Sequence, residues 1–340
     1  MCVADGRVYV GSRDAADRQD VCTAHDVATG EALWTFATDA PLDLDYGNAP
    51  RATPAYADGL LVVLGAGGRL RALDAATGLE FWSVDLAERY GVETPTWGFG
   101  NSPLVIGDSV FVQVGGPVRA AAFDLTTGEE VWANEGAGLP HASLTPLPGE
   151  ALRLAGVDRD GHFVLDAASG ETLWTHRPEY FEEFGVPSPV VLPGAVAFTG
   201  ENTGVLRFPL LAGMPAPRTS AANDLLTPDS HTPVFAGGVL LVAYEGLSGL
   251  DPATLAANWT IAADDVRAYA SVLAADDRAL VTTEAGDVLL IAFGPGKAEV
   301  IDRMRLTDKP SRVLSHPAVA GDRLLFRVGA ELRCHRLPRD

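Results

Sequence analysis

Histidine and cysteine are the side chains of this sequence best suited to hold a metal ion or to act as nucleophiles. The seven histidines form no HxxH or HExxH spacing. The three cysteines, Cys2, Cys22 and Cys334, lie far apart and form neither a CxxC motif nor an adjacent pair. The sequence therefore predicts no metal knuckle and no disulfide framework, and we interpret the thiols as buried or idle.

Oxygen ligands for calcium are the next possibility. Glu201-Asn202 has suitable residue types but lies between Gly200 and Gly204, as expected for a hairpin tip. The segment 158–161 (DRDG) resembles the start of a calcium loop but lacks the remaining ligands and the closing Glu. No GxSxG, no P-loop and no GxGxxG followed by a helix occurs, so no catalytic set is predicted.

Composition excludes several classes of protein. The chain has 340 residues, 47% of them hydrophobic, which is enough apolar content to bury a core. Its 25 Lys and Arg against 45 Asp and Glu give a formal charge of −20, which disfavours binding to nucleic acid. The longest apolar runs, such as 239–243, fall far short of the roughly 20 residues that span a bilayer. We therefore expect no membrane helix and no nucleic-acid partner.

An internal repeat shows which elements position these side chains. An Asp, a Gly four places on and a Trp eight places after the Asp recur along the chain, as in Asp74, Gly78 and Trp82. The five Trp residues that follow such an Asp by eight places are Trp34, Trp82, Trp132, Trp174 and Trp259, the last in a weaker copy that lacks the Gly. The intervals between the five Asp residues are 48, 50, 42 and 85 residues, the last being two periods. With a degenerate copy near Phe208 and two more copies near Phe293 and Arg336, the count is eight units.

A second series has the same interval. A Ser or Thr followed by Pro precedes a tight-turn pair, as Thr53-Pro54 precedes Asp58-Gly59. Each unit then contains short apolar or alternating runs, which predict four strands joined by hairpins. The Asp side chain can accept hydrogen bonds from backbone N–H groups two or three residues on, and the Gly supplies the positive φ that closes the corner.

A repeat of this length and content predicts an all-β fold, an eight-bladed β-propeller of four-stranded antiparallel blades. The Ala-x-Asp-x-x-Thr-Gly-x-x-x-Trp corner resembles the tryptophan-docking repeat of the pyrroloquinoline-quinone (PQQ)-like propellers. That superfamily includes quinoprotein alcohol dehydrogenases and the outer-membrane assembly factor BamB. The segments 47–54 and 97–103 are also typical of the BamB-like group. The resemblance covers the whole chain and implies one PQQ-like propeller domain over residues 1–340.

The resemblance also implies a structural role for the five Trp side chains, which in this family dock against a neighbouring blade. In relatives an upstream strand commonly completes the last blade, whereas this chain enters its first unit at once through residues 3–6. We therefore expect a truncated N-terminus and a last blade of three strands with an exposed edge. The chain shows no signal peptide, so either the protein is cytoplasmic or its beginning is missing.

The quinoprotein branch needs PQQ, a calcium ion held by Glu, Asn and Asp, a catalytic Asp and, in many members, a ring of two adjacent cysteines. No segment matches that set, so no cofactor is predicted, with PQQ and Ca²⁺ as the alternative. Three histidines, His141, His231 and His316, lie where innermost strands begin and could form an imidazole ring or simply a solvated channel lining. The candidate ligand-binding residues at the channel mouth are Arg51, Asn101, His141, His231 and Tyr269.

Long connections between units are the other candidate surface. These are Thr38–Arg51 with its acidic residues, Glu88–Asn101, Glu179–Phe184 and the Pro-rich Met214–Pro228. They are either binding loops or ordinary surface insertions. Our leading hypothesis is a monomeric, non-catalytic scaffold that binds a protein through these rim loops, similar to BamB and concerned with envelope assembly. By resemblance it would be exported to the periplasm. The alternatives are a quinoprotein-like oxidoreductase or small-ligand binder that uses the channel, and a ligand-sensing domain of a larger protein.

Overall fold

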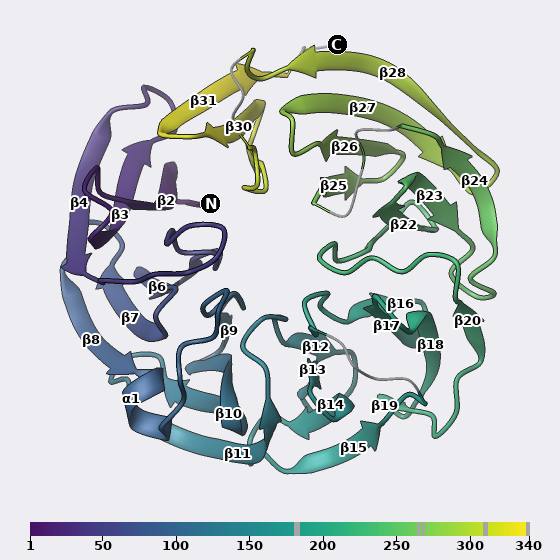
Figure 1. Ribbon diagram of the computed structural model, residues 1–340, viewed down its shortest axis with the longest axis horizontal. Coiled ribbons are helices and arrows are strands. Elements are labelled where there is room, and N and C mark those ends of the chain that lie inside the picture. The colour runs from purple at the N-terminus through teal and green to yellow at the C-terminus, as the bar shows by residue number, and fades with distance from the viewer. Residues whose placement is uncertain (180–183, 264–265, 267–268, 309–311, 338–340) are drawn as a thin grey trace. The chain divides into compact units, whose positions relative to one another are not determined.

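Short antiparallel sheets follow one another along the whole chain (Figure 1). The computed structural model describes residues 1–179, 184–263, 266, 269–308 and 312–337. These residues form eight sheets, and the predicted eight-bladed β-propeller is confirmed. Contacts divide the chain into two compact units, of which unit 1 is Met1–Pro146 with Leu154–Leu173 and unit 2 is Leu147–Arg153 with Trp174–Asp340.

Unit 1 contains the first three sheets and most of the fourth. In the first two sheets the strand order follows the chain. The first sheet comprises β1 (Cys2–Ala4), β2 (Arg7–Arg13), β3 (Gln19–Asp26) and β4 (Ala32–Asp39). The second comprises β5 (Ala55–Ala57), β6 (Leu60–Leu64), β7 (Arg69–Asp74) and β8 (Glu80–Asp85). The third comprises β9 (Leu104–Ile106), β10 (Ser109–Asp124) and β11 (Glu130–Gly138), and the fourth β12 (Thr145–Leu147), β13 (Arg153–Asp158), β14 (Gly161–Asp166) and β15 (Thr172–His176).

Unit 2 contains the remaining four sheets. The fifth comprises β16 (Val190–Leu192), β17 (Ala195–Gly200), β18 (Gly204–Leu211), β19 (Met214–Pro215) and β20 (Ala221–Asn223). The sixth comprises β21 (Val234–Ala236), β22 (Val239–Tyr244), β23 (Gly246–Leu250) and β24 (Ala257–Ile261). The seventh comprises β25 (Ser271–Ala275), β26 (Arg278–Thr282), β27 (Asp287–Gly294) and β28 (Lys297–Arg305). The eighth comprises β29 (Ala318–Ala320), β30 (Arg323–Val328) and β31 (Glu331–Arg336).

Three details refine the sequence prediction. The last sheet has three strands within the described residues, as expected. In the third sheet one strand, β10, replaces two expected strands, and Gly115 and Gly116 with positive φ lie inside it. In the degenerate fifth unit a short strand, β20, pairs with β18 although the Asp, Gly and Trp are lost. Backbone pairing therefore completes that blade without the repeat's usual side chains.

The one helix among the described residues is α1 (Leu86–Tyr90), a short helix that follows β8. The Asp85 side chain accepts a hydrogen bond from the Glu88 N–H at its start, and Gly91 ends it with φ of 63°. The connection Glu179–Phe184, one of the candidate binding loops, lies largely outside the described residues. No helix in the described part of the chain is long and apolar enough to cross a membrane.

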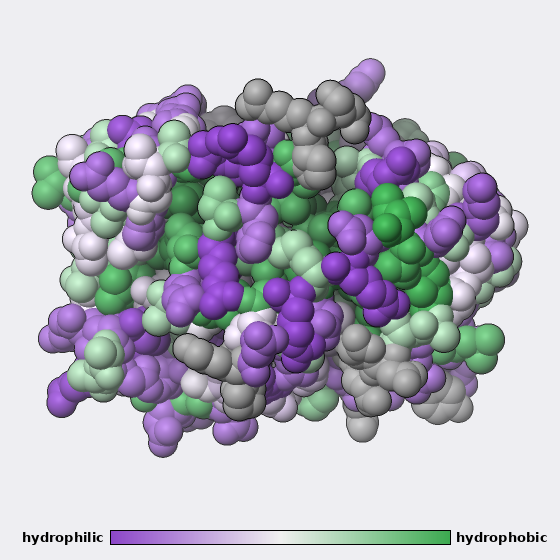
Figure 2. All heavy atoms as spheres, turned by 90° about the horizontal axis from the view of Figure 1, so that it is seen from above, coloured by the Kyte–Doolittle hydropathy of each residue, from purple (hydrophilic) through white to green (hydrophobic). Residues whose placement is uncertain are grey.

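The core lies between successive sheets rather than in one centre. Between the first two sheets of unit 1 it contains Tyr9, Ala24, Leu61 and Leu73, all 0% exposed. In unit 2 a similar cluster joins β22 to β25, β26 and β27. The face shown in Figure 2 carries mainly hydrophilic side chains with hydrophobic ones set between them. Stability therefore depends on each contact between neighbouring blades.

Candidate functional site

The repeated Asp residues are fully occupied by their own corners. Asp74 Oδ1 accepts hydrogen bonds from the Thr77 hydroxyl and N–H, both at 2.7 Å, and from the Ala76 N–H at 3.1 Å. These bonds, led by the one from the Thr77 hydroxyl, lower the pKa of Asp74. The same arrangement holds Asp26, Asp124, Asp166 and Asp251. These carboxylates shape turns and are not poised for acid–base chemistry.

The indole rings reach from one blade to the next. Trp82 Nε1 donates to the Leu125 carbonyl at 2.8 Å, and its ring covers Gly128, where a Cβ atom would lie 2.6 Å from the indole. Equivalent bonds join Trp34 to Ala75 at 3.1 Å, Trp132 to Ala167 at 2.9 Å and Trp259 to Gly294 at 2.8 Å. Each ring buries apolar area and satisfies its N–H group in the neighbouring blade.

Two positions in this series differ from the others. Trp174 meets the degenerate fifth sheet, and its ring packs against Phe208 at a centroid distance of 5.2 Å and against Phe198 at 5.9 Å. The corner glycine of the first sheet, Gly30, has φ of 77° and no heavy atom within 4 Å of where a Cβ atom would lie. The first corner therefore carries no indole.

The Ser/Thr-Pro series has a role that the sequence did not reveal. The Thr53 N–H donates to Ser102 Oγ at 2.9 Å, and the Ser102 N–H donates to Ser143 Oγ at 2.9 Å. In unit 2 the Ser188 N–H donates to Thr232 Oγ1 at 3.0 Å. Each hydroxyl thus accepts a hydrogen bond from the preceding blade. The recurrence of a hydroxyl before Pro was the available signal, since Pro fixes the start of the strand.

Among the candidate ligand-binding residues of unit 1, Asn101 is fully buried. Its Nδ2 donates to the carbonyls of Gln113 at 2.9 Å and Pro140 at 3.2 Å, and its Oδ1 accepts from the Gln113 N–H. The side chain therefore joins two blades. It does not reach solvent, because its N–H groups are taken up by the backbone carbonyls next to it.

Arg51 and His141 are partly buried. The Arg51 guanidinium donates to three carbonyls of its own loop, those of Asp45 at 2.8 Å, Gly47 at 2.9 Å and Ala49 at 3.0 Å. Burial lowers the pKa of Arg51. The His141 ring lies 5.8 Å from the Trp97 ring, between centroids. Arg51 thus holds a loop in shape rather than presenting its charge to a ligand.

In unit 2, His231 is 3% exposed and occupies the place before β21 that Asn101 occupies before β9. Burial, followed by the nearby His316, lowers the pKa of His231 to about 4, opposed by hydrogen bonds to the backbone of Ala270 and Leu241. Tyr269 is 40% exposed, and the Arg312 guanidinium lies 5.6 Å from its ring centroid. The five candidates are divided between the two units, so a common ligand ring stays a prediction.

The calcium candidates have other tasks. Asp158 Oδ1 accepts from the Asp160 N–H at 2.8 Å, as in a turn, and Asp158 Oδ2 forms a buried ion pair with Arg119. Glu201 and Asn202 form the turn between β17 and β18, as expected. Within the described residues no three His, Cys, Asp or Glu side chains lie close enough to hold a metal ion together.

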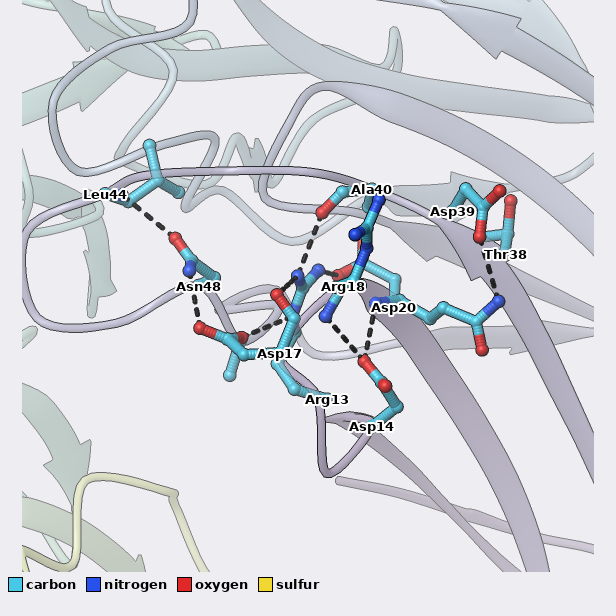
Figure 3. Close-up of polar contacts among 12 residues, drawn as sticks. Arg13, Asp14, Asp17, Arg18, Asp20, Thr38, Asp39, Ala40, Leu44 and Asn48 are labelled. Atoms are coloured by element: carbon cyan, nitrogen blue, oxygen red, sulfur yellow. Dashed lines mark hydrogen bonds and ion pairs between the residues drawn. The ribbon is translucent and has the colours of Figure 1, made fainter.

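Three connections of unit 1 lie together and form one surface. We call it the loop platform and define it as residues 13–19, 39–51 and 91–98. Arg13 lies at its base, where Nε contacts Asp17 Oδ1 at 2.9 Å, Nη1 contacts Asp20 Oδ1 at 2.8 Å, and Nη2 donates to the Ala40 carbonyl at 2.9 Å (Figure 3). Asn48 Nδ2 in turn donates to Asp17 Oδ2 at 2.7 Å.

Further contacts fasten the platform to the second sheet and to the next connection. Asn48 Oδ1 accepts from the Leu44 N–H at 2.9 Å, and the Asp45 N–H donates to the Thr96 carbonyl at 3.0 Å. The Leu42 side chain covers Gly67 in the turn between β6 and β7. The sequence indicated Thr38–Arg51 and Glu88–Asn101 by their length, but not residues 13–19, nor that Arg13 and Asn48 would hold the three connections together.

The sequence was also compared with models of known protein families. Residues 17–198 match the family model of the outer membrane protein assembly factor BamB. The chain belongs to the BamB family.

The chain is also similar in sequence to two enzymes, a tetrathionate hydrolase and a methanol dehydrogenase. Tetrathionate hydrolase of Acidithiobacillus ferrooxidans is 29% identical over 202 residues, which are 54% of this chain and 38% of that protein. Lanthanide-dependent methanol dehydrogenase of Methylacidiphilum fumariolicum is 39% identical over 83 residues, which are 23% of this chain and 13% of that protein. The matched parts are thus well under half of these relatives.

A solved structure extends the likeness to the whole fold. BamB from Moraxella catarrhalis superposes with a TM-score of 0.66 at 16% identity, covering 98% of this chain and 96% of that one. The identity is low, so this similarity concerns the fold.

The similarity to a methanol dehydrogenase raises the question whether this chain has residues that could hold PQQ and its metal ion. The donor set of this BamB family member does not fit them: the described residues offer no cluster of metal ligands, and the three free cysteines include no adjacent pair.

Proposed function

We propose that this protein is a protein-binding scaffold and that its binding surface is the loop platform. The observation that carries the proposal is the fastening of residues 39–51 by Arg13, Asn48 and Arg51, which fixes three connections in one arrangement. A rigid loop surface binds with less loss of conformational entropy than a mobile one. Nothing in the propeller fold itself requires connections of this length.

The platform also presents a suitable anchor. Tyr46 is 63% exposed and lies between the exposed acidic residues Asp45 and Asp43 and the Gly47 turn. Exposed aromatic side chains are enriched where proteins bind one another. Membership of the BamB family supports a protein partner, a place in envelope assembly and export to the periplasm. We propose further that residues 1–340 act as one domain and as a monomer.

Site-specific photocrosslinking in cells that make the protein naturally tests this proposal. A photoreactive phenylalanine at Tyr46 should give a discrete protein adduct, and the same group at Phe81, 61% exposed on β8, is the matched control. The Arg13→Met variant, which unfastens residue 40, should weaken the Tyr46 adduct. Equal adducts at both positions, or none at Tyr46, would contradict the assignment.

A quinoprotein-like oxidoreductase or small-ligand binder is the second candidate, and the 39% identity to a lanthanide-dependent methanol dehydrogenase favours it. Adding PQQ with Ca²⁺ or with a lanthanide ion, and following absorbance and dye reduction with methanol, distinguishes the two functions. Saturable cofactor binding with alcohol oxidation would overturn the scaffold. Absence of both would leave the scaffold as the better account.

A further inference from the structure

The fifth sheet, in unit 2, lacks the repeat's Trp on its outer strand. In four other sheets that Trp pairs with a small residue on the strand next to it, which leaves room for the ring. A Cβ atom on Gly249, for example, would lie 2.2 Å from the Trp259 indole. The pairs are Trp34 with Ala24, Trp82 with Ala72, Trp132 with Ala122 and Trp259 with Gly249.

In the fifth sheet the large and small members of this pair are exchanged. Ala221 on β20 has the outer position, and Arg207 on β18 is its partner. Arg207 pairs in turn with Ala197 on β17, as Ala72 pairs with Val62 on β6, and both of these partners lie three places after a turn glycine. Arg207 therefore has the position of Ala72, and the long side chain has moved from the outer strand to the strand beside it.

The Arg207 side chain makes the hydrogen bond that an indole makes elsewhere. Arg207 Nε donates to the Pro252 carbonyl of the sixth sheet's corner at 2.9 Å. Pro252 directly follows the corner residue Asp251, just as Leu125, the acceptor of Trp82, directly follows an Asp. A guanidinium on a different strand thus reaches the same acceptor in the next blade.

The corner that receives this bond has changed in step. Leu255 stands where the other corners have Gly, four places after the Asp, and it has φ of 59°. A β-carbon is unfavourable in this left-handed conformation. The Leu255 side chain is 1% exposed and packs in an apolar cluster with Val205 of the fifth sheet and Leu240 of the sixth. This burial offsets the strain, and there is room for the side chain because no indole covers the corner.

Asn223 adds a second hydrogen bond between the same two sheets. Its Nδ2 donates to the Leu255 carbonyl at 2.9 Å, and its Oδ1 accepts from the N–H groups of Leu225 and Leu226, both at 3.1 Å. One side chain therefore ties the sixth sheet's corner to the end of Met214–Pro228, one of the candidate binding loops.

We propose that Arg207, Asn223 and Leu255 form a substitute joint, which replaces the docked indole between the fifth and sixth sheets and positions the end of Met214–Pro228. Arg207 supplies the donor, Leu255 supplies the buried apolar contact, and Asn223 attaches the connection. Removing Arg207 should therefore loosen the corner at residues 251–255 locally while the sheets stay folded.

Native-state hydrogen exchange of the whole chain, followed by mass spectrometry, tests the joint. In the Arg207→Ala variant the amides of residues 253–256 should exchange roughly tenfold or more faster, because a hydrogen bond from a charged donor is lost. The matched control is Arg153→Ala, which removes a bond of 2.7 Å to the Ala212 carbonyl outside the joint and should leave these amides unchanged. Equal exchange at residues 253–256 in the two variants would overturn the proposal.

A second variant restores the residues of the usual repeat. In Arg207→Ala/Ala221→Trp/Leu255→Gly the new indole should dock on the new glycine, so residues 253–256 should exchange more slowly than in Arg207→Ala alone. A triple variant that is no better protected would contradict the exchange of roles. Neither measurement uses a partner, so a failure of the scaffold function would leave both results unchanged.

Discussion

Replacing Trp82 by alanine should strongly destabilise unit 1. Trp82 is 8% exposed, its N–H is bonded to the Leu125 carbonyl at 2.8 Å, and its ring rests on Gly128. Truncating a buried Trp or Phe to Ala costs about 3–5 kcal/mol of unfolding free energy. The neighbouring residue, Phe81, is 61% exposed, and surface truncations of this kind usually change stability by about 0.5 kcal/mol or less. Adjacent aromatic residues on one strand therefore have very different predicted costs.

Urea unfolding followed by far-ultraviolet circular dichroism measures this difference, because the signal does not depend on the removed indole. The variants are Trp82→Ala, Phe81→Ala and Trp82→Phe. The last keeps most of the ring but removes the donor to Leu125, which should cost about 1 kcal/mol. If Trp82→Ala falls within about 1 kcal/mol of Phe81→Ala, when about 3–5 is expected, the docked indole is not what holds the blades together.

Three further changes test other parts of the structure. In thermal unfolding, Gly128→Ala should destabilise the protein about 1–3 kcal/mol more than Gly30→Ala. Both glycines have a positive φ, but only at residue 128 would a Cβ atom collide with an indole ring. Equal losses of stability in the two variants would contradict this. Asp158→Ala should cost about 3–5 kcal/mol in urea unfolding by leaving Arg119 buried and unpaired, whereas a double change of both to Leu should recover much of the loss. Because the pKa of His231 is lowered in the folded protein, the unfolded chain binds a proton more readily, and the free energy of unfolding should fall as the pH drops from about 6.5 towards 4. The His231→Asn variant should lack roughly 3 kcal/mol of that fall. If the variant and the original protein show the same pH dependence of stability, the burial argument is refuted.

The fold was predictable because its determinants are local and repeated. An Asp, a Gly and a Trp at constant spacing report a corner and an outer strand, and the corner bonds of Asp74 are formed within four residues of the chain. Eight such units leave little choice of architecture. The fifth blade was harder to read because β20 pairs with β18 through backbone atoms, which impose no residue type.

The candidate site was much less predictable. A polar residue before a strand can face solvent or the carbonyls of the next blade, and the pattern is the same in both cases. Asn101 and His231 face the next blade, where the backbone of Pro140 and Ala270 provides hydrogen-bond partners. Arg13 was missed because its acceptors, such as Ala40, are brought to it only by folding. Contacts between blades join residues far apart in the chain, such as Trp82 and Leu125 at 43 positions and Thr53 and Ser102 at 49, which a period alone does not pair.

The bare corner at Gly30 makes the four turns of unit 1 unequal in what they can accommodate. Corners at Gly78, Gly128 and Gly170 each lie beneath an indole, so an inserted affinity tag or fluorescent reporter there would dislodge a ring. At the Gly30 corner the same insertion dislodges no ring, although it separates the Ala28 and Thr29 N–H groups that both donate to Asp26 Oδ1. That turn is the natural attachment point for labelling this molecule or tethering it to a surface while its other joints stay intact.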